Sequence, residues 1–478
     1  MHQVQLGSCD VAIIGGGIAG MVSAVKASQH GLNVIVLERS EQAQYVCNSR
    51  MTSGIFHCAL KSVTSPTTEL AQKITEVTQG QADPMQLQAI ADDALKAVRW
   101  LQEQGMRFIK GSLPYYDFTL APPTVNPLNE GWQGRGGDVL LRTLESSLNK
   151  RVGQVLRGKC AKELFLEDGI CVGVSGFDLQ GRAWSLNAKK TIIADGGFQT
   201  NLELLKGAIS PAPEKVFQRN SRTGMGDGLK MAVNAGAALS ELNGFYGHIL
   251  SVDAFHNDQL WPHLWLDFVA AAGLLINTQG SRFTDEGRGG VSMANSIARE
   301  ENPLGTWVIA DQIIWQERGT INVQAPNPRL IDAGATVHRA NELKELSALT
   351  QIPWDTLENT ILTYNSAVES NRLNTLLPIR TDFQYKAYAI LKPPFYAIPV
   401  CAGITYTMGG ISIDGHARVL NQQKNPIEGL YAVGATTGGL EGGPSVGYVG
   451  GLIKSTVMGL RAADFIAVLL EKNLKGCT

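Results

Sequence analysis

The stretch "CDVAIIGGGIAGMVSAVKASQHGLNVIVLERS", residues 9–40, decides the fold of the chain. Its apolar run at 11–14 ends in glycine and predicts a buried parallel strand. Residues 18–29 predict a helix, and the apolar run at 34–37 predicts a second strand that is closed by Glu38. Strand, helix, strand and acid in this order predict a βαβ unit that binds a dinucleotide at its first turn.

The glycine pattern GxGxxG at this turn is formed by Gly15, Gly17 and Gly20, and each glycine has a physical task. Gly15 makes the tight turn, Gly17 lets a pyrophosphate approach the backbone, and Gly20 lets helix and strand pack closely. The helix N-terminus faces the phosphates, and Glu38 accepts hydrogen bonds from ribose hydroxyls. The competing interpretation is a glycine-rich turn without a ligand, and the motif alone leaves NAD or FAD open. The predicted cofactor-binding residues of this unit are Gly15, Gly17, Ile18, Ala19, Gly20, Glu38 and Arg39.

The composition is that of a globular protein with more than one domain. A length of 478 residues predicts two or three domains, and 44% hydrophobic with 18% charged residues argues against disorder. The formal net charge of -2 gives no field for nucleic acid or an anionic membrane. We see no apolar run long enough to span a membrane and no signal peptide. The seven cysteines include no CxxC pair, which excludes the common zinc, thioredoxin-like and haem signatures and favours free thiols in the cytoplasm.

Further along the chain, several glycine-containing segments follow a second pattern. They read "YVCNSRMTSGIFH" (45–57), "IIADGGF" (192–198), "TGMGDGLKMAVNAGA" (223–237), "NTQGSRFTDEG" (277–287), "TMGGISIDGHARVL" (407–420) and "IEGLYAVGATTGG" (427–439). Together and in this order they resemble the fumarate reductase/succinate dehydrogenase flavoprotein family. The finer resemblance is to its tricarballylate dehydrogenase-like and 3-ketosteroid dehydrogenase-like branches.

The resemblance implies FAD and an α/β fold, in which a capping domain of α+β type is inserted into a doubly wound, glutathione-reductase-like FAD-binding domain. In succinate dehydrogenases a histidine of the first segment bonds covalently to the flavin. This chain has Asn48 at that place, so the resemblance implies FAD that is bound non-covalently. The further cofactor-binding residues that it implies are Asn48, Ser49, Ser53, Gly54, Ala194, Gly196, Gly197, Asp227, Gly434, Gly450, Leu452 and Ile453.

The domain organisation follows from where these segments lie. We predict an FAD-binding domain over 1–240 and 397–478, interrupted by a capping and substrate domain over 241–396. Residues 155–195 alternate in polarity and predict a β-meander that leads back into the sheet. In the cap, Asp355 is expected to cap the helix that reads "WDTLENTILTYNSAVESN".

Flavin chemistry at a carbon–carbon bond requires transfer of a hydride, transfer of a proton and stabilisation of a substrate oxygen that gains negative charge. The flavin transfers the hydride, and protein groups transfer the proton and stabilise the oxygen. In fumarate reductases an arginine just downstream of the RFxxE motif donates the proton, and Arg288 is the counterpart here, at a slightly different spacing. A guanidinium acts as an acid only through a relay, for which Glu286 is the candidate. His248 falls where the family often has a histidine that contacts a substrate carboxylate. The competing interpretations are a solvated arginine in a glycine-rich loop and a core histidine.

Two tyrosines replace charged groups of the family. Fumarate reductases have a histidine before "TMGG" and an arginine near the terminal helix, and both hold substrate carboxylates. This chain has Tyr406 and Tyr448 at those places. A phenol has a pKa near ~10 and donates a hydrogen bond at neutral pH. We therefore predict that Tyr406 donates to a substrate oxygen, that Tyr448 is a second donor or the proton carrier, and that the substrate is less charged than a dicarboxylate.

The leading functional prediction is an FAD-dependent dehydrogenase or ene-reductase that acts on CH–CH groups next to a carbonyl or carboxyl group. It implies a small-molecule substrate and a separate electron donor or acceptor. The alternative is a non-catalytic flavin-binding subunit of an electron-transfer or biosynthetic complex, and a dehydrogenase that uses only a nicotinamide is a third option. The sequence leaves open the substrate, the reaction direction, the electron partner and the oligomeric state.

Overall fold

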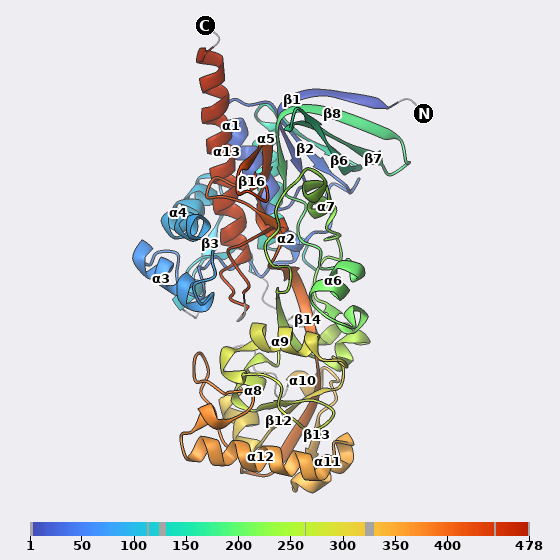
Figure 1. Ribbon diagram of the computed structural model, residues 1–478, viewed down its shortest axis with the longest axis vertical. Coiled ribbons are helices and arrows are strands. Elements are labelled where there is room, and N and C mark those ends of the chain that lie inside the picture. The colour runs from blue at the N-terminus through green and yellow to red at the C-terminus, as the bar shows by residue number, and fades with distance from the viewer. Residues whose placement is uncertain are drawn as a thin grey trace.

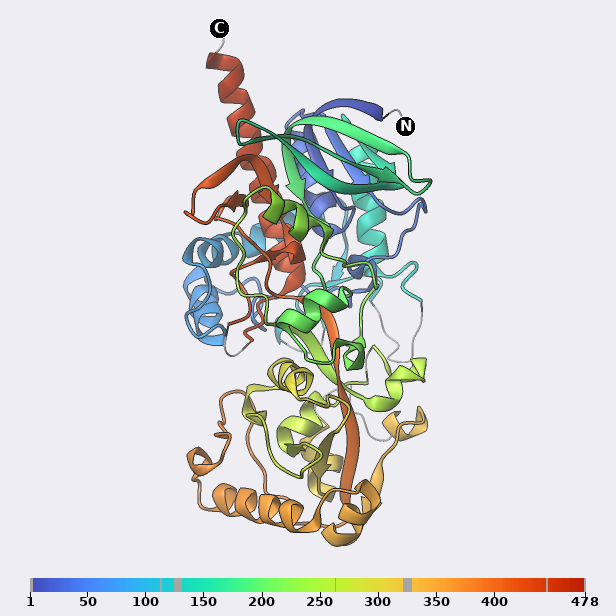
Figure 2. The same cartoon turned by 45° about the vertical axis from the view of Figure 1, so that its right-hand side comes forward.

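The chain folds into two lobes that are joined by a few long connections (Figures 1 and 2). The computed structural model describes residues 3–111, 114–123, 131–262, 264–320, 329–443 and 446–476. One lobe, here called the nucleotide lobe, is built on a mainly parallel sheet and holds both ends of the described chain. The other, the cap lobe, is built on a largely antiparallel sheet.

The sheet of the nucleotide lobe has the parallel order β17-β8-β1-β2-β5. Its strands are β1 (Val4–Ile14), β2 (Val34–Glu38), β5 (Gly153–Arg157), β8 (Ala183–Ile193) and β17 (Pro426–Ala432). Every residue of β2 is buried, as expected for a strand with helices or strands on both faces. The predicted β-meander is present as β6 (Lys159–Glu167) and β7 (Ile170–Asp178), which pair antiparallel before β8, and β16 (Arg418–Leu420) adds an antiparallel edge.

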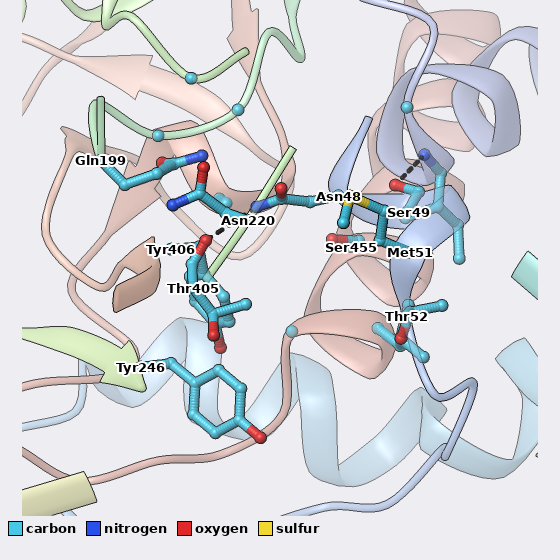
Figure 3. A pocket seen from close by; sticks show the side chains of 18 of the residues that line it. Asn48, Ser49, Met51, Thr52, Gln199, Asn220, Tyr246, Thr405, Tyr406 and Ser455 are labelled. Atoms are coloured by element: carbon cyan, nitrogen blue, oxygen red, sulfur yellow. Dashed lines mark hydrogen bonds between the residues drawn. The ribbon is translucent and has the colours of Figure 1, made fainter. Parts of the chain in front are cut away.

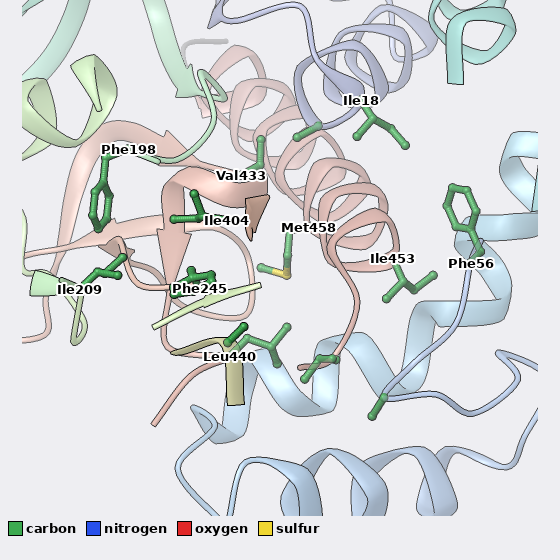
Figure 4. Close-up of a cluster of buried hydrophobic side chains, with 14 of the residues drawn as sticks. Ile18, Phe56, Phe198, Ile209, Phe245, Ile404, Val433, Leu440, Ile453 and Met458 are labelled. Atoms are coloured by element: carbon green, nitrogen blue, oxygen red, sulfur yellow. The ribbon is translucent and has the colours of Figure 1, made fainter. Parts of the chain in front are cut away.

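Helices cover this sheet because their apolar stripes pack on its strands and on one another. Figure 4 shows Ile18 of α1, Ile453 and Met458 of α13, and Val433, which follows β17, as members of one cluster of buried side chains. Asp83 caps α4 by accepting hydrogen bonds from Met85 N and Gln86 N. The helices of this lobe are α1 (Ile18–Gln29), α2 (Asn48–Met51), α3 (Thr67–Val77), α4 (Pro84–Glu103), α5 (Gly136–Asn149), α6 (Leu202–Ala208), α7 (Asp227–Asn234) and α13 (Gly451–Gly476).

The cap lobe is centred on β14 (Phe395–Thr407), a long strand that pairs with four neighbours. The neighbours are β9 (Phe217–Gln218), β10 (Phe245–Ser251), β12 (Thr306–Ala310) and β13 (His338–Ala340), and β11 (Leu274–Ile276) pairs with β12. Helices α8 (Asp267–Ala272), α9 (Gly290–Arg299), α10 (Arg329–Asp332), α11 (Leu343–Thr350) and α12 (Trp354–Glu369) surround the sheet. The domain boundary proposed at residue 397 falls inside β14, which runs from the far end of the cap to the junction of the lobes (Figure 1).

Smaller elements complete the description. β3 (Phe108–Ile109) pairs with β4 (Thr119–Leu120), and β15 (Ile411–Ser412) pairs with β18 (Thr437–Gly438). The expected cap of α12 by Asp355 is wrong, because Pro353 precedes the helix and no side chain caps it. Asp355 instead lies in the first turn, where its negative charge interacts favourably with the positive end of the helix dipole. The cysteines in the described part of the chain are free thiols, and Cys477 lies outside it.

Candidate active site

A cavity of about 1170 Å³ lies at the junction of the two lobes. The carboxyl ends of β1, β2 and β8 line one part of its wall, and β10 and β14 of the cap lobe line another. Figure 3 shows Asn48 and Ser49, from the segment after β2, together with Tyr246, Thr405 and Tyr406 from the cap sheet. In open α/β sheets, ligands bind outside the carboxyl ends of the strands, which is where this cavity lies.

The glycine turn after β1 is held in the shape that its sequence predicts. Gly15 has φ +105°, and a Cβ on it would lie 2.6 Å from the carbonyl oxygen of Ala194. A Cβ on Gly20 would lie 2.0 Å from the oxygen of Gly15, so only glycine lets α1 pack this closely on the turn. Ile18 N donates to Ser49 Oγ at 3.0 Å, which ties the start of α1 to the segment after β2.

Two carboxyl groups stand beside this turn, and both have raised pKa values because they are buried. Glu38 accepts hydrogen bonds from Gly16 N at 3.1 Å and Ser40 N at 2.9 Å, but burial still raises its pKa. Burial raises the pKa of Asp195 to about 6, against an opposing hydrogen bond from Gly228 N. Acceptors of this kind suit the hydroxyl groups of a ribose or a ribityl chain.

The cavity wall also has polar atoms and space that a ligand of this class would use. Asp195 Oδ1 and the buried Gln199 Oε1 have no hydrogen-bond partner among the described residues, although both residues line the cavity. Gly196 also lines it, and a Cβ built there would have no heavy atom within 4 Å. Buried polar atoms without partners are uncommon in folded proteins, so these residues fit a hydroxyl-bearing dinucleotide such as FAD.

Most residues predicted to bind the cofactor line this cavity. Those on its wall are Gly15, Gly17, Ile18, Ala19, Glu38, Arg39, Asn48, Ser49, Ser53, Ala194, Gly196, Gly197, Asp227 and Leu452. Five of the predicted residues are not part of the wall, and their role at the cofactor stays a prediction: Gly20, Gly54, Gly434, Gly450 and Ile453. Two of them support the wall from behind: a Cβ on Gly434 would lie 2.7 Å from that of Ala19, and a Cβ on Gly20 would lie 2.0 Å from the oxygen of Gly15.

Asn48 joins the two lobes through its side-chain amide. Its Nδ2 donates to Thr405 O at 2.8 Å, and its Oδ1 accepts from Ser221 N and Ser221 Oγ, each at 2.8 Å. The residue that replaces the histidine of covalent flavoproteins therefore has an evident structural task here. Its amide group offers no nucleophile for a bond to a cofactor.

The hydroxyl of Tyr406, a residue of the cavity wall, is hydrogen-bonded to a buried carboxylate. It donates to Glu441 at 3.1 and 3.2 Å, and Glu441 also accepts from Val449 N and Gly450 N. Lys454 Nζ lies 3.7 Å from the same carboxylate. Because a carboxylate only accepts hydrogen bonds, the phenol proton belongs to this pair. This corrects the prediction that Tyr406 is a donor to the substrate, since only its oxygen remains to accept a bond.

Tyr448 lies beside a histidine that the sequence analysis did not single out. Its hydroxyl is 3.3 Å from His57 Nε2, and its ring stacks on Tyr246 with centroids 4.2 Å apart. His57 Nδ1 accepts a hydrogen bond from Leu60 N at 3.2 Å. Burial lowers the pKa of His57 to about 4, so the imidazole is neutral at physiological pH.

Tyr246 and His248 continue this contact into the cap lobe. Tyr246 Oη lies 3.0 Å from His248 Nε2, and His248 Nδ1 lies 2.6 Å from Asp267 Oδ2. Burial lowers the pKa of His248, and the neighbouring Asp267 opposes this shift. The ring of His248 stacks on Trp265 at 3.8 Å. His248 is thus both a packed residue and part of the cavity wall.

The arginines at this end of the cavity differ in their surroundings. Arg219 is held by Thr405 Oγ1 at 2.7 Å and Pro262 O at 2.9 Å, and its guanidinium lies over the Trp265 ring. Arg288 lines the cavity, with its side chain about one-third exposed and its Nε 3.4 Å from Asp285. Both supply positive charge to the part of the wall that the cap lobe forms.

Glu286 is not placed to pass protons to Arg288. Its side chain is fully buried, lies outside the cavity wall, and pairs with Arg282 at 2.6 Å and Arg380 at 3.6 Å. Its Oε1 also accepts from Leu275 N. The predicted relay is therefore corrected to a structural ion cluster inside the cap, and the carboxylate next to Arg288 is Asp285.

The sequence did not predict a role in the site for His57, Tyr246, Asp267, Arg219, Glu441 and Lys454. Tyr246 had a signal, because residues two apart on a strand share a face and His248 was already a candidate. Glu441 sits between glycines in "GLEGG" and Lys454 in the apolar stretch "GLIKS", and both are unusual places for a charge. Asp267 and Arg219 had no such signal, since the fold brings them in from distant segments.

Neither a metal site nor a membrane-spanning helix is found among the described residues. No group of three or more histidine, cysteine, aspartate or glutamate side chains in the described ranges is placed to hold a metal ion. Among the helices that the structure describes, none combines the length and apolar character needed to cross a membrane.

The similarity of this chain to known sequences indicates which class of ligand the cavity binds. Residues 10–447 match the family described as "FAD binding domain". Vinyl phenol reductase of Lactiplantibacillus plantarum is 25% identical over 481 residues, covering 91% of each chain. Fumarate reductase (cytochrome) of Shewanella frigidimarina is 24% identical over 477 residues, covering 97% of this chain and 78% of the relative.

Comparison with solved structures supports the same fold. The 3-ketosteroid-Δ4-(5α)-dehydrogenase of Rhodococcus jostii RHA1 superposes with a TM-score of 0.72 at 18% identity, covering 98% of this chain and 100% of that one. The open conformation of a flavocytochrome c3 fumarate reductase superposes with a TM-score of 0.67 at 22% identity, covering 97% of this chain and 79% of that one. The predicted fold class and family resemblance are confirmed.

Proposed function

Because the chain belongs to the FAD binding domain family, we propose that it is an FAD-dependent oxidoreductase that reduces a carbon–carbon double bond next to a carbonyl or carboxyl group. The observation that carries the proposal is the single cavity that joins the glycine turn to the phenols and arginines of the cap side. Two of the curated relatives are named as reductases, of vinyl phenol and of fumarate, which supports the reducing direction.

Several residues of the wall are placed to hold the cofactor. The turn Gly15–Gly17 with the N-terminus of α1 suits a pyrophosphate, and Glu38 suits ribose hydroxyls. When bound, FAD supplies the hydride chemistry, and the protein supplies orientation and charge. The N-terminus of α13, at Gly451, adds a partial positive charge that favours negative charge on a ligand beside it.

The substrate that we propose carries less negative charge than a dicarboxylate. Tyr406 and Tyr448 stand where the resemblance places a histidine and an arginine, so two cationic groups are absent from this chain. Arg219 and Arg288 remain at this end of the cavity. A conjugated carbonyl compound or monocarboxylate meets this wall with fewer buried, unpaired charges than a dicarboxylate does.

The test uses photoreduced, oxygen-free holoprotein mixed separately with 4-vinylphenol, trans-cinnamate, benzylideneacetone, acrylate and fumarate. We expect the yellow oxidised spectrum to return with at least one of trans-cinnamate, benzylideneacetone and acrylate, and to return more slowly with fumarate. Reoxidation by 4-vinylphenol alone would overturn the proposed carbonyl or carboxyl neighbour of the double bond. A Tyr448→Phe variant should keep its yellow colour but lose about 10²-fold in the rate of substrate-linked reoxidation, because a donor is lost. A holoprotein that none of the five compounds reoxidises would overturn the proposal.

We also propose that FAD is bound non-covalently, because Asn48 carries no nucleophile and its amide contacts protein groups. Precipitating the yellow holoprotein with acid should leave all flavin fluorescence in the supernatant. Flavin that stays with the pellet, or with the chain on a denaturing gel, would contradict this.

The electron partner and location that we propose follow from the composition. A separate electron carrier is expected, because the described cysteines show no cluster for an iron–sulfur centre. The same cysteines are free thiols, which are typical of a reducing compartment, and we propose the cytoplasm.

A further inference from the structure

The hydrogen bonds of His57 settle which of its nitrogens carries the proton. A neutral imidazole has one N–H, and the other nitrogen only accepts. Leu60 N donates to Nδ1 at 3.2 Å, so Nδ1 is the acceptor and the proton is on Nε2. Nε2 therefore donates to the Tyr448 oxygen, 3.3 Å away.

The turn that presents the Leu60 amide has an unusual backbone. Cys58 and Lys61 exchange two backbone hydrogen bonds, of 3.0 and 2.8 Å, across Ala59 and Leu60. Both central residues have positive φ, 48° and 60°, as a type I′ turn requires. Such turns normally use asparagine and glycine, so alanine and leucine keep a costly conformation here, and costly conformations cluster at functional sites.

The same turn is fastened to the segment that carries Tyr448. Ala59 N donates to Val449 O at 2.6 Å, and a Cβ on Gly450 would lie 2.7 Å from the carbonyl oxygen of His57. His57 and the Tyr448 hydroxyl are thus held at a set separation by backbone contacts as well as by their own hydrogen bond.

With its oxygen occupied by His57, Tyr448 directs its own proton elsewhere. The ring of Tyr448 stacks on that of Tyr246 with centroids 4.2 Å apart, and both residues line the cavity, so the proton of Tyr448 is available on the cavity side. Tyr406 has the opposite arrangement, because its proton is committed to Glu441. The two phenols that sequence analysis treated alike therefore differ: one is a donor toward the cavity and the other an acceptor.

We infer that His57 is a positioning residue, whose Nε2–H occupies the oxygen of Tyr448 and so makes Tyr448 the hydrogen-bond donor to the substrate oxygen. This rests on the proposed function for the presence of a substrate oxygen, which would accept the hydrogen bond from Tyr448. As negative charge develops on the substrate oxygen, donation from His57 strengthens donation by Tyr448, because hydrogen bonds in a chain polarise one another.

The first test needs no substrate. Holoprotein labelled with ¹⁵N-histidine is followed by long-range ¹H–¹⁵N spectra, and the His57 signals are assigned by their loss in His57→Gln. We expect a protonated Nε2 and an unprotonated Nδ1 at neutral pH, with no titration near the ordinary histidine pKa. Tyr448→Phe should shift the Nε2–H signal, and Tyr396→Phe, in the far part of β14, should not. A proton on Nδ1, a cationic ring at neutral pH, or a signal that ignores Tyr448→Phe would overturn the inference.

The second test asks whether the donated hydrogen bond matters for turnover. His57→Gln keeps an N–H donor, whereas His57→Phe has none. With the compound that reoxidises the holoprotein fastest, we expect His57→Phe to lose about tenfold or more in kcat relative to His57→Gln, with little change in KM. Equal losses in both variants would overturn the inference. If none of the five compounds reoxidises the holoprotein, the proposed function fails, while the spectra still decide the state of His57.

Discussion

Hydrogen-bond direction at single hydroxyls sets what the cavity offers a ligand. Tyr406 and Tyr448 have the same functional group, both are buried, and burial raises the pKa of each well above its usual value. They differ only in their neighbours, a carboxylate for one and a neutral imidazole for the other. An acceptor-only neighbour takes the phenol proton, and a donating neighbour leaves it free.

Removing the Tyr406 hydroxyl should therefore lower stability. Tyr406→Phe takes one donor from the buried Glu441 carboxylate, and hydrogen bonds to charged groups are worth about 2 kcal/mol. We expect a loss of that size in the free energy of urea unfolding of the holoprotein. Tyr396→Phe is the control, because Tyr396 lies on the same strand and has no side-chain hydrogen bond among the described residues. Equal stabilities of the two variants would contradict the Tyr406–Glu441 assignment.

His57 should contribute a recognisable pH dependence to stability. Its pKa is about 4 in the folded protein and 6.5 otherwise, so between these values the unfolded chain binds a proton that the folded chain does not. Stability is therefore unaffected above pH 6.5 and falls as the pH drops toward 4, by about 2 kcal/mol at pH 5 for this residue. Urea unfolding at pH 7 and pH 5 should show a smaller drop for His57→Gln than for the unchanged protein. Parallel pH profiles would contradict the lowered pKa.

At the scale of elements, close packing at one point positions the cofactor turn. β1 and α1 approach each other so closely at Gly20 that no side chain fits between Gly20 and the Gly15 carbonyl. The carboxyl ends of β1 and β2, which lie in register from Val11 with Val34 to Ile14 with Leu37, then place the turn and Glu38 at one edge of the sheet.

Gly20→Ala should displace α1 and weaken FAD binding. Relieving such an overlap costs typically 1–3 kcal/mol, so we expect the dissociation constant for FAD to increase about tenfold or more. The measurement is flavin fluorescence quenching on titration of the apoprotein. Gly207→Ala in α6 is the matched control, because a Cβ there meets no atom within 4 Å and the backbone is not left-handed. FAD affinity that is unchanged in Gly20→Ala would contradict the packing argument.

At the scale of the whole molecule, the cavity keeps its shape only if the two lobes keep a fixed position relative to each other. β14 carries Thr405 and Tyr406 to the junction from within the cap sheet, and Asn48 of the nucleotide lobe binds the Thr405 carbonyl. The inside of the cap contains a buried ion cluster that is formed by Glu286, Arg282 and Arg380. A buried charge that loses its partner is costly, so removing one member of this cluster should destabilise the cap.

Glu286→Gln should destabilise the cap without changing the chemistry. Breaking a buried ion pair costs about 3 kcal/mol or more, and we expect faster proteolysis within the cap and a loss of that size in unfolding free energy. The pH profile of substrate-linked reoxidation should keep its shape, because Glu286 does not line the cavity. Glu69→Gln, which breaks the exposed pair with Lys61, should change stability by less than about 1 kcal/mol. A shifted pH profile in Glu286→Gln would restore the proton-relay interpretation.

The sequence by itself determined the βαβ unit, the predicted FAD site at its glycine turn and the fold class. The βαβ unit depends on local patterns: an apolar run, three glycines at set spacing and an acid at the end of the next strand. FAD and the fold class were implied by the family resemblance of segments along the whole chain. It also pointed to Tyr406, Tyr448, Arg288 and His248 at the cavity. Only the tertiary structure decided what those side chains do, because hydrogen-bond direction depends on neighbours such as Glu441 and His57, which are distant in sequence. Glu286 moved from the active site to the cap core for the same reason, since Arg380, almost a hundred residues away, completes its ion cluster.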